Sequence, residues 1–357
     1  MLLPDVGPPP RVAAISVNSA RRATLRNAQL VTNIVNGLPA TERFLVLTND
    51  RSAFTVARDD HPGRVRFLEL PFESPITIWT QDPFLVLTGP GDTITLLTSK
   101  TFERADDRLM ADVIAREGGY HVKKSELFFE GGNIVSDDEH ILIGADTIRR
   151  NAVEFDVPDA EVVLRFEEEL GRSVLVIGPF PQPIAHIDMA ITPLGGGRIA
   201  VADASAGAAI AERALKENPA SVAEFERWTE EHFFGDPAIR ELTGIGGSLT
   251  APHVAGRTAE MIAKSRQVAP LLDGVAAALE QNGYRVSRVP LLWGGPEGEP
   301  GADDKERMRA AYPILTYNNV IDEPDATPRR VYLARYGCPA LDDAARDAWA
   351  ALGFSTR

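Results

Sequence analysis

The chain of 357 residues contains a single cysteine, Cys338. One thiol excludes an intrachain disulfide and a metal cluster held by several cysteines. The sequence also lacks an apolar run of membrane-spanning length, and its start, Met1–Asp5, shows neither the basic nor the apolar region of a secretory signal. Basic residues are outnumbered by acidic ones, 37 against 51, and the net charge of −14 argues against binding to nucleic acid. We therefore expect a cytoplasmic protein with no nucleic-acid or membrane partner.

The remaining composition is ordinary for a globular protein. Hydrophobic residues make up 44% of the chain and charged residues 25%, which suffices for a sizeable core. We expect a single domain over residues 1–357, with an irregular N-terminal segment at 1–20 and an insertion at 205–257. The sequence leaves open whether the protein forms a homo-oligomer.

A repeated order of elements runs through the chain: a helix ending at glycine, a strand, a polar residue and a hairpin. The predicted hairpins span residues 84–98, 133–144, 187–203 and 318–336. The predicted helices cover residues 23–35, 105–116, 160–170, 222–231, 258–280 and 342–352. Repeats of this size cannot each bury their own apolar face, so the pattern favours an α/β ring of like units.

Side chains suited to chemistry stand at equivalent places in four of these units, just before each hairpin. They are Asp82, Glu130, the pair His186 and Asp188, and the pair Asn318 and Asn319. In a closed ring, equivalent positions converge near the axis. The repeat therefore predicts one axial site, in which we assign the two asparagines no catalytic role.

The stretch from Ala185 to Thr192 alternates polar and apolar residues and predicts a strand. In a strand, His186 and Asp188 would share one face, and the apolar residues between and after them would share the other. A histidine beside a carboxylate is typical of a general acid/base pair.

Each candidate also has a plainer interpretation. His186 and Asp188 also fit a strand whose polar face simply meets water. Asp82, which precedes Pro83, also fits a turn residue. Glu130, followed by glycine, also fits a solvated turn carboxylate, and Trp79 also fits an aromatic residue of the core.

Four short segments carry a resemblance to a known family. They are Trp79-Thr80-Gln81-Asp82, Glu130-Gly131-Gly132-Asn133, His186-Ile187-Asp188 and Thr316-Tyr317-Asn318-Asn319. At these segments the chain resembles the guanidino-group-modifying (pentein) superfamily, and in particular agmatine deiminases and bacterial peptidylarginine deiminases. The resemblance implies a pseudo-five-fold α/β propeller, of which the fifth unit is apparently incomplete in this chain.

The resemblance also implies an activity: hydrolysis of a guanidino C–N bond in agmatine, arginine or an arginyl peptide, with release of ammonia and without a cofactor or metal. Asp82, Glu130 and Asp188 would cradle the guanidinium by charge-assisted hydrogen bonds. His186 would be the general acid/base. Trp79 and Asn133 would complete the substrate-binding set.

Two departures from the family pattern stand out. Gln81 replaces the arginine of the family's Trp-x-Arg-Asp element, so a positive charge beside Asp82 is missing. The family's nucleophilic cysteine follows the last helix, where this chain has Phe354–Arg357 and no cysteine. Cys338 lies in the turn before that helix, where the helix dipole would in principle lower the pKa of its thiol.

Three explanations of the missing nucleophile remain open. The given chain is part of a longer active deiminase, or it is a pseudoenzyme that binds guanidinium compounds without turning them over. The third explanation is a different chemistry, in which His186, Asp188 and Glu130 hold a metal ion.

Overall fold

The computed structural model describes residues 1–6, 12–17, 31–49, 63–71, 73–74, 76–102, 104, 106–229, 256–294, 314–323 and 326–357. The chain divides into two compact units, Met1–Phe180 and Pro181–Arg357. Five three-stranded sheets form among the described residues, and none contains strands of both units. The expectation of one domain stays a prediction.

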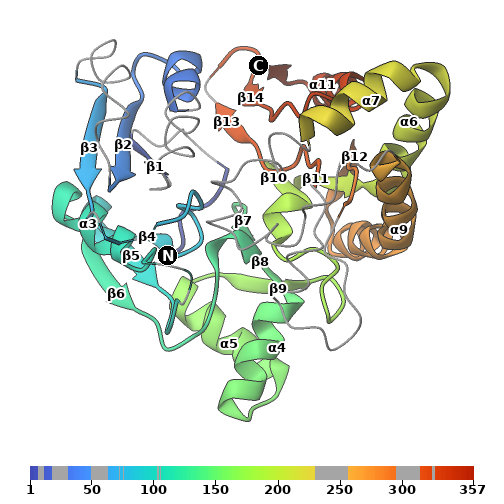
Figure 1. Ribbon diagram of the computed structural model, residues 1–357. Coiled ribbons are helices and arrows are strands. Elements are labelled where there is room, and N and C mark those ends of the chain that lie inside the picture. The colour runs from blue at the N-terminus through green and yellow to red at the C-terminus, as the bar shows by residue number, and fades with distance from the viewer. Residues whose placement is uncertain are drawn as a thin grey trace. The chain divides into compact units, whose positions relative to one another are not determined.

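The first unit holds three of these sheets (Figure 1). One sheet is entirely parallel and consists of β1 (Val12–Ser16), β2 (Arg43–Thr48) and β3 (Val65–Glu69). The second consists of β4 (Phe84–Thr88), β5 (Ile94–Thr98) and β6 (His121–Lys124). The third consists of β7 (Ile134–Ser136), β8 (His140–Gly144) and β9 (Ser173–Ile177). In the second and third sheets an antiparallel hairpin is followed by a parallel strand, which confirms the first two predicted hairpins.

Helices of the first unit connect the hairpins to their third strands. They are α3 (Leu109–Gly118), α4 (Ala145–Phe155) and α5 (Asp159–Leu170). The sequence does not predict α4, because two of its inward positions are polar. Thr147 and Asn151 are buried there and form hydrogen bonds with residues outside the helix, so the helix shows no continuous apolar stripe. Of the predicted helix 23–35, residues 31–35 are helical and the helix continues to residue 37, whereas residues 23–30 lie outside the described residues.

The second unit repeats the same plan twice. One sheet consists of β10 (Ile191–Gly195), β11 (Arg198–Asp203) and β12 (Arg285–Pro290). The other consists of β13 (Ile321–Glu323), β14 (Arg330–Tyr332) and β15 (Ser355–Thr356). In both sheets the first two strands are antiparallel and the third is parallel to the second. The third and fourth predicted hairpins are therefore confirmed.

The described helices of this unit are α6 (Ala204–Glu217), α7 (Pro219–Thr229), α9 (Arg257–Gln281) and α11 (Pro339–Ala351). The expected insertion thus begins with two helices, α6 and α7. The first starts directly at the end of β11, where the Asp203 carboxylate accepts a hydrogen bond from the amide of Ala206. The side of α6 packs along α9 (Figure 1). Residues 230–255 of the expected insertion lie outside the described residues.

The last strand of the chain corrects the predicted unit boundaries. The repeat count places the start of the incomplete fifth unit at about Phe354, after the last predicted helix, but Ser355 and Thr356 pair in parallel with Arg330 and Val331. They complete the fourth hairpin's sheet, because α11 reverses the chain and brings its end back alongside β14. The fifth three-stranded sheet is the parallel one formed by β1, β2 and β3.

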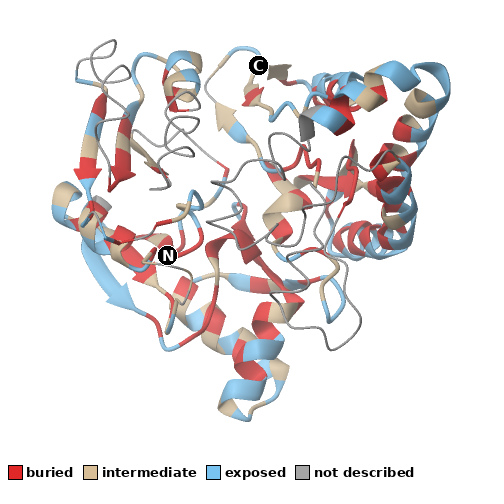
Figure 2. Cartoon of the chain, in the orientation of Figure 1, coloured by how far each residue is buried: buried red, intermediate tan, exposed pale blue. Residues whose placement is uncertain are grey.

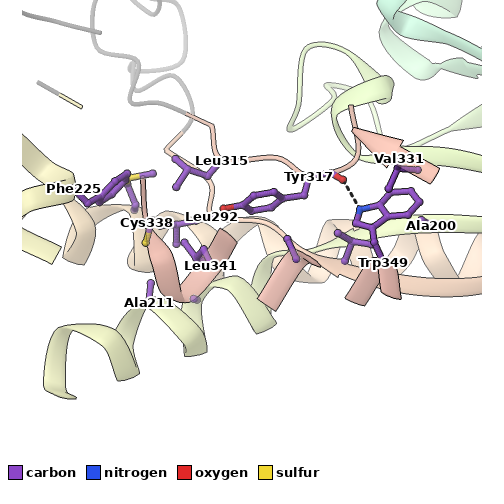
Figure 3. Close-up of a cluster of buried hydrophobic side chains, with 14 of the residues drawn as sticks. Ala200, Ala211, Phe225, Leu292, Leu315, Tyr317, Val331, Cys338, Leu341 and Trp349 are labelled. Atoms are coloured by element: carbon purple, nitrogen blue, oxygen red, sulfur yellow. Dashed lines mark hydrogen bonds between the residues drawn. The ribbon is translucent and has the colours of Figure 1, made fainter. Parts of the chain in front are cut away.

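Figure 2 shows buried residues on the helices and strands of the second unit. Trp349 of α11 belongs to this unit's core cluster (Figure 3). Trp349 is fully buried, and its indole N–H donates to the backbone oxygen of Tyr317 at 2.9 Å. The hydroxyl of Tyr317 in turn donates to Asp342 at 2.8 Å, so both large aromatic residues satisfy their polar atoms inside the core. Phe354 packs edge-on against Trp349, with ring centroids 5.2 Å apart.

Among the described residues, no helix combines the length and the apolar character needed to cross a membrane.

A pair of tryptophan variants tests this core. Trp349→Ala should lower the free energy of unfolding by about 3–5 kcal/mol, because it removes a fully buried ring and leaves a cavity. Trp79→Ala is the matched control, since that ring is 46% exposed and its loss should have a much smaller effect. Urea titration followed by circular dichroism measures both variants. Equal losses of stability would contradict this assignment of the core.

Candidate functional site

The loop from Ile76 to Asp82 carries the first predicted site residues, and it is anchored at several points. Ile76 is buried in the core of the first unit. The backbone amide of Thr77 and its hydroxyl both donate to the Asp107 carboxylate, at 2.7 and 2.5 Å. Thr80 accepts a hydrogen bond from the amide of Ser16 in β1, at 2.7 Å. The loop is therefore held to β1 and to the residues just before α3, which fixes the position of Asp82.

A short 3-10 turn, Gly131–Asn133, holds the Asp82 carboxylate from the other side. The Gly131 amide donates to the backbone oxygen of Asp82 at 2.9 Å, and the Gly132 amide donates to its Oδ1 at 3.0 Å. A Cβ atom at Gly131 would lie 2.1 Å from the backbone oxygen of Gln81. Only glycine allows this close approach, so the glycines after Glu130 place the two predicted carboxylates next to each other.

Arg104 joins these carboxylates, and sequence reasoning missed it. Its Nη2 lies 2.5 Å from Asp82 Oδ2, and its Nη1 lies 3.4 Å from Glu130 Oε2. Its guanidinium carbon lies 4.9 Å from the centre of the Trp79 ring and 5.1 Å from that of Phe102. The guanidinium is thus bound by two carboxylates and stacked on aromatic rings.

Asp107 is a third carboxylate of this cluster. It is fully buried, and its Oδ2 also accepts a hydrogen bond from Arg104 Nε at 3.5 Å. Burial raises the pKa of Asp107, while its bonds from Thr77 and the charge of Arg104 act in the opposite direction. The Asp107 side chain therefore binds both the loop that carries Asp82 and Arg104, which pairs with Asp82.

The other predicted site residues of the first unit, Trp79, Glu130 and Asn133, differ in how far they are buried. Trp79 is 46% exposed, so the interpretation of this ring as a core aromatic is wrong. Glu130 is half-buried and paired with Arg104. Asn133 is buried, and its amide donates to the hydroxyl of Thr147 at 2.8 Å. This contact with α4 gives Asn133 a structural role, and its contact with a substrate stays a prediction.

The predicted strand around His186 is wrong. Ile187–Met189 forms a 3-10 turn, and the strand β10 begins only at Ile191. The reason lies in the partner strand: β11 ends at Asp203, and the residues that the antiparallel register would place opposite Asp188 and Ile187 already belong to α6. His186 and Asp188 therefore do not alternate on a strand face. His186 is the extended residue before the turn, and Asp188 is its middle residue.

The turn at His186 nevertheless supports the predicted repeat. His186 has φ −123° and ψ 134°, and Glu130 has φ −121° and ψ 136°. Each residue precedes a three-residue 3-10 turn that leads into the first strand of a hairpin. The two positions are thus equivalent in local structure, as the repeat predicts.

Neighbouring repeats also come together within the second unit. The side-chain amide of Asn319 donates to Asp188 Oδ2 at 3.2 Å. The hydroxyl of Thr316 donates to the backbone oxygen of Met189 at 2.5 Å, and that of Thr192 donates to the backbone oxygen of Asn318 at 2.5 Å. Polar positions of the third and fourth repeats are therefore adjacent, as those of the first and second are at Asp82 and Glu130.

Cys338 is a residue of the core. It is 3% exposed and precedes α11 among the apolar side chains of the second unit (Figure 3). Burial, together with the charge of Asp342, raises the pKa of its thiol to about 11. The lowering of this pKa that a helix dipole would in principle cause is not seen, because desolvation of the thiolate dominates.

The hypothesis of a metal bound by Glu130, His186 and Asp188 involves both units and stays a hypothesis. Metal content of the purified protein tests it. The expectations about cofactors, partners and oligomeric state likewise remain predictions.

Comparison with solved structures identifies the fold. The chain is similar to an agmatine deiminase of C. jejuni with a TM-score of 0.57 and 13% sequence identity, over 99% of this chain and 88% of that one. A cysteine-to-serine variant of that enzyme with substrate bound gives a TM-score of 0.56 at 13% identity, over 99% and 89% of the two chains. No protein-family model and no curated protein matches the sequence. The predicted resemblance is thus confirmed at the level of the fold, which is a mixed α/β fold of several small sheets.

One feature of the sequence indicates that a cation is missing beside Asp82, without indicating which residue supplies it. Gln81 replaces a family arginine beside Asp82, so another cation had to balance the buried carboxylate. The sequence offers no way to choose Arg104 for this role, because it lies 22 residues from Asp82 in a segment without a motif.

A glycine variant tests the close contact at the site. Gly131→Ala should lower the free energy of unfolding by about 1–3 kcal/mol, because the added methyl group collides with the backbone at Gln81. Gly274→Ala is the control: it lies in α9 with open space around its Cβ position, and should raise stability by about 0.5–1 kcal/mol. Urea unfolding measures both variants, and a neutral Gly131→Ala would refute the contact.

Cys338 should react slowly in the native protein. With a pKa of about 11, about one thiol in 1000 is ionised at pH 8, against about one in four for an ordinary cysteine. The rate of reaction with a disulfide reagent should rise about tenfold per pH unit between pH 8 and 10, because the thiolate forms only above that range. The denatured protein is the control and should react at once. A rate in the native state that levels off below pH 8 would contradict the raised pKa.

Proposed function

We propose that this protein is a deiminase-type hydrolase that acts on the guanidino C–N bond of agmatine, arginine or an arginyl peptide and releases ammonia. The observation that carries the proposal is the first unit's cluster of Asp82, Glu130 and Trp79, which already holds a guanidinium group, that of Arg104. The acceptors and the aromatic face that this group needs are therefore present. The fold shared with an agmatine deiminase supports the same class of reaction.

We further propose that the five sheets form a pseudo-five-fold α/β propeller. Four of them share one plan, an antiparallel hairpin followed by a parallel strand. The equivalent turns at Glu130 and His186 support the repeat as well.

In this proposal the carboxylates bind and the histidine transfers protons. Asp82 and Glu130 accept hydrogen bonds from the substrate guanidinium, and Asp188 contributes a further carboxylate. His186 takes a proton from water, whose oxygen ends on the guanidino carbon, and gives a proton to the nitrogen that leaves as ammonia. The product is the corresponding ureido compound.

A second candidate is a protein that binds guanidinium compounds without turnover. The burial of Cys338 favours it, because the one thiol of the chain is inaccessible and carries a raised pKa. Incubation with agmatine, arginine and an arginyl peptide, followed by an ammonia assay, separates the two candidates. Ammonia release that persists in Cys338→Ala supports the hydrolase, whereas calorimetric binding without ammonia supports the second candidate. No binding and no ammonia would refute both.

Two isosteric variants test the carboxylates. Asp82→Asn and Glu130→Gln should each weaken binding of agmatine by about 1.5–3 kcal/mol, as expected when a hydrogen bond to a charged group is lost. Glu126→Gln is the matched control, since it removes the same charge from an exposed position four residues before Glu130. Calorimetry of all three proteins gives the comparison. An unchanged affinity in both site variants would exclude the carboxylates from binding.

A further inference from the structure

The carboxylate assigned to the substrate already has partners for both oxygens. The Asp82 side chain is 4% exposed. Its Oδ1 accepts a hydrogen bond from the Gly132 amide, and its Oδ2 accepts one from Arg104 Nη2 at 2.5 Å. A substrate guanidinium that approaches Asp82 therefore meets an oxygen that another guanidinium already binds.

Arg104 makes the contacts that the proposed function assigns to the substrate. It pairs with Asp82 and Glu130 and stacks over Trp79. Its end group is also the chemical group that the substrate presents: a planar cation with a fork of N–H donors. Two such groups compete for the same acceptors.

The structure also suggests that Arg104 can leave this position. Of its three hydrogen bonds with carboxylates of the described residues, the one with Asp82 is short, whereas those with Glu130 and Asp107 measure 3.4 and 3.5 Å. The Arg104 side chain is 29% exposed. When Arg104 moves away, buried Asp107 keeps both hydrogen bonds from Thr77. The guanidinium of the ligand then replaces that of Arg104 at Asp82.

We propose that Arg104 is an internal occupant of the guanidinium site, and that a guanidino ligand binds by displacing it. The inference rests on the proposed function, since it concerns the same carboxylates. The observed affinity of a ligand then equals its intrinsic affinity multiplied by the fraction of molecules in which Arg104 lies away from these carboxylates. Arg104 thereby sets how much guanidino ligand is needed to fill the site.

Removal of the internal guanidinium tests the displacement. Arg104→Gln should bind agmatine and the guanidinium ion itself at least about fivefold more tightly than the unchanged protein, because the competing group is gone. Arg108→Gln is the control: it removes an equal charge from a 65% exposed side chain whose recorded partner, Asp106, is 3.9 Å away. Its affinity should be unchanged. Calorimetry measures binding, and circular dichroism confirms folding.

Arg104→Gln removes the charge beside Asp82 and could fail to fold for that reason alone. A second variant and a second measurement therefore test the displacement without that loss of charge. Arg104→Lys keeps a cation there but lacks the guanidinium fork, and should also bind the ligand more tightly. In the unaltered protein, the Nε–H resonance of Arg104, assigned by its absence in that variant, should shift when agmatine is added.

The outcomes separate this inference from the proposed function. If the unaltered protein binds agmatine and both Arg104 variants bind it equally or more weakly, Arg104 only positions the carboxylates, and displacement is refuted. If neither the unaltered protein nor the variants bind, the proposed function fails together with the inference. Tighter binding in the variants with an unchanged Arg108→Gln supports displacement.

Discussion

The ion pair between Arg104 and Asp82 is the interaction on which the rest of the first unit's site depends. Asp82 and Asp107 are almost completely removed from water, and Glu130 lies on the same guanidinium. Three carboxylates close together repel one another, and burial adds a desolvation cost for each buried charge. A single guanidinium offsets both effects through its fork of donors. Without it, the loop that presents Trp79 and Asp82 would be held against a cluster of uncompensated charge.

A second constraint is the shape of the backbone before the second and third hairpins. At Glu130 and at His186 the chain is extended for one residue, makes a 3-10 turn and then enters a strand. In this conformation the residue before the turn takes no part in strand pairing. Its charged or polar side chain therefore lies just ahead of the first strand of the hairpin. At Gly131 the turn also packs directly against the backbone of Gln81, which leaves no room for a side chain. The repeat is therefore a way of presenting polar side chains, as well as a way of building sheets.

Much of the fold could be predicted from local pattern. The four hairpins, the strands β2 and β3 and the long helix α9 follow from alternation, glycine stops and apolar periodicity. The failures have one cause, which is that distant partners override the local pattern. Helix α4 contains buried polar residues that form hydrogen bonds with other segments. The predicted strand at His186 does not form. Strand β15 joins the sheet of the fourth hairpin by pairing with β14.

The sequence by itself determined the repeat, the types of residue before each hairpin and the likeness in fold to a deiminase, because these depend on local order along the chain. Only the tertiary structure decided which charges meet. It brought Arg104 to Asp82 and Glu130 across more than twenty residues and placed Cys338 in the core. It also joined Asn319 to Asp188. The repeat predicts that Asp188 and Asn319 lie near each other, but the position of Arg104 depends on how sheets and helices pack, and no spacing in the sequence encodes it. The acidic site was therefore predictable, and the guanidinium that already occupies it was not.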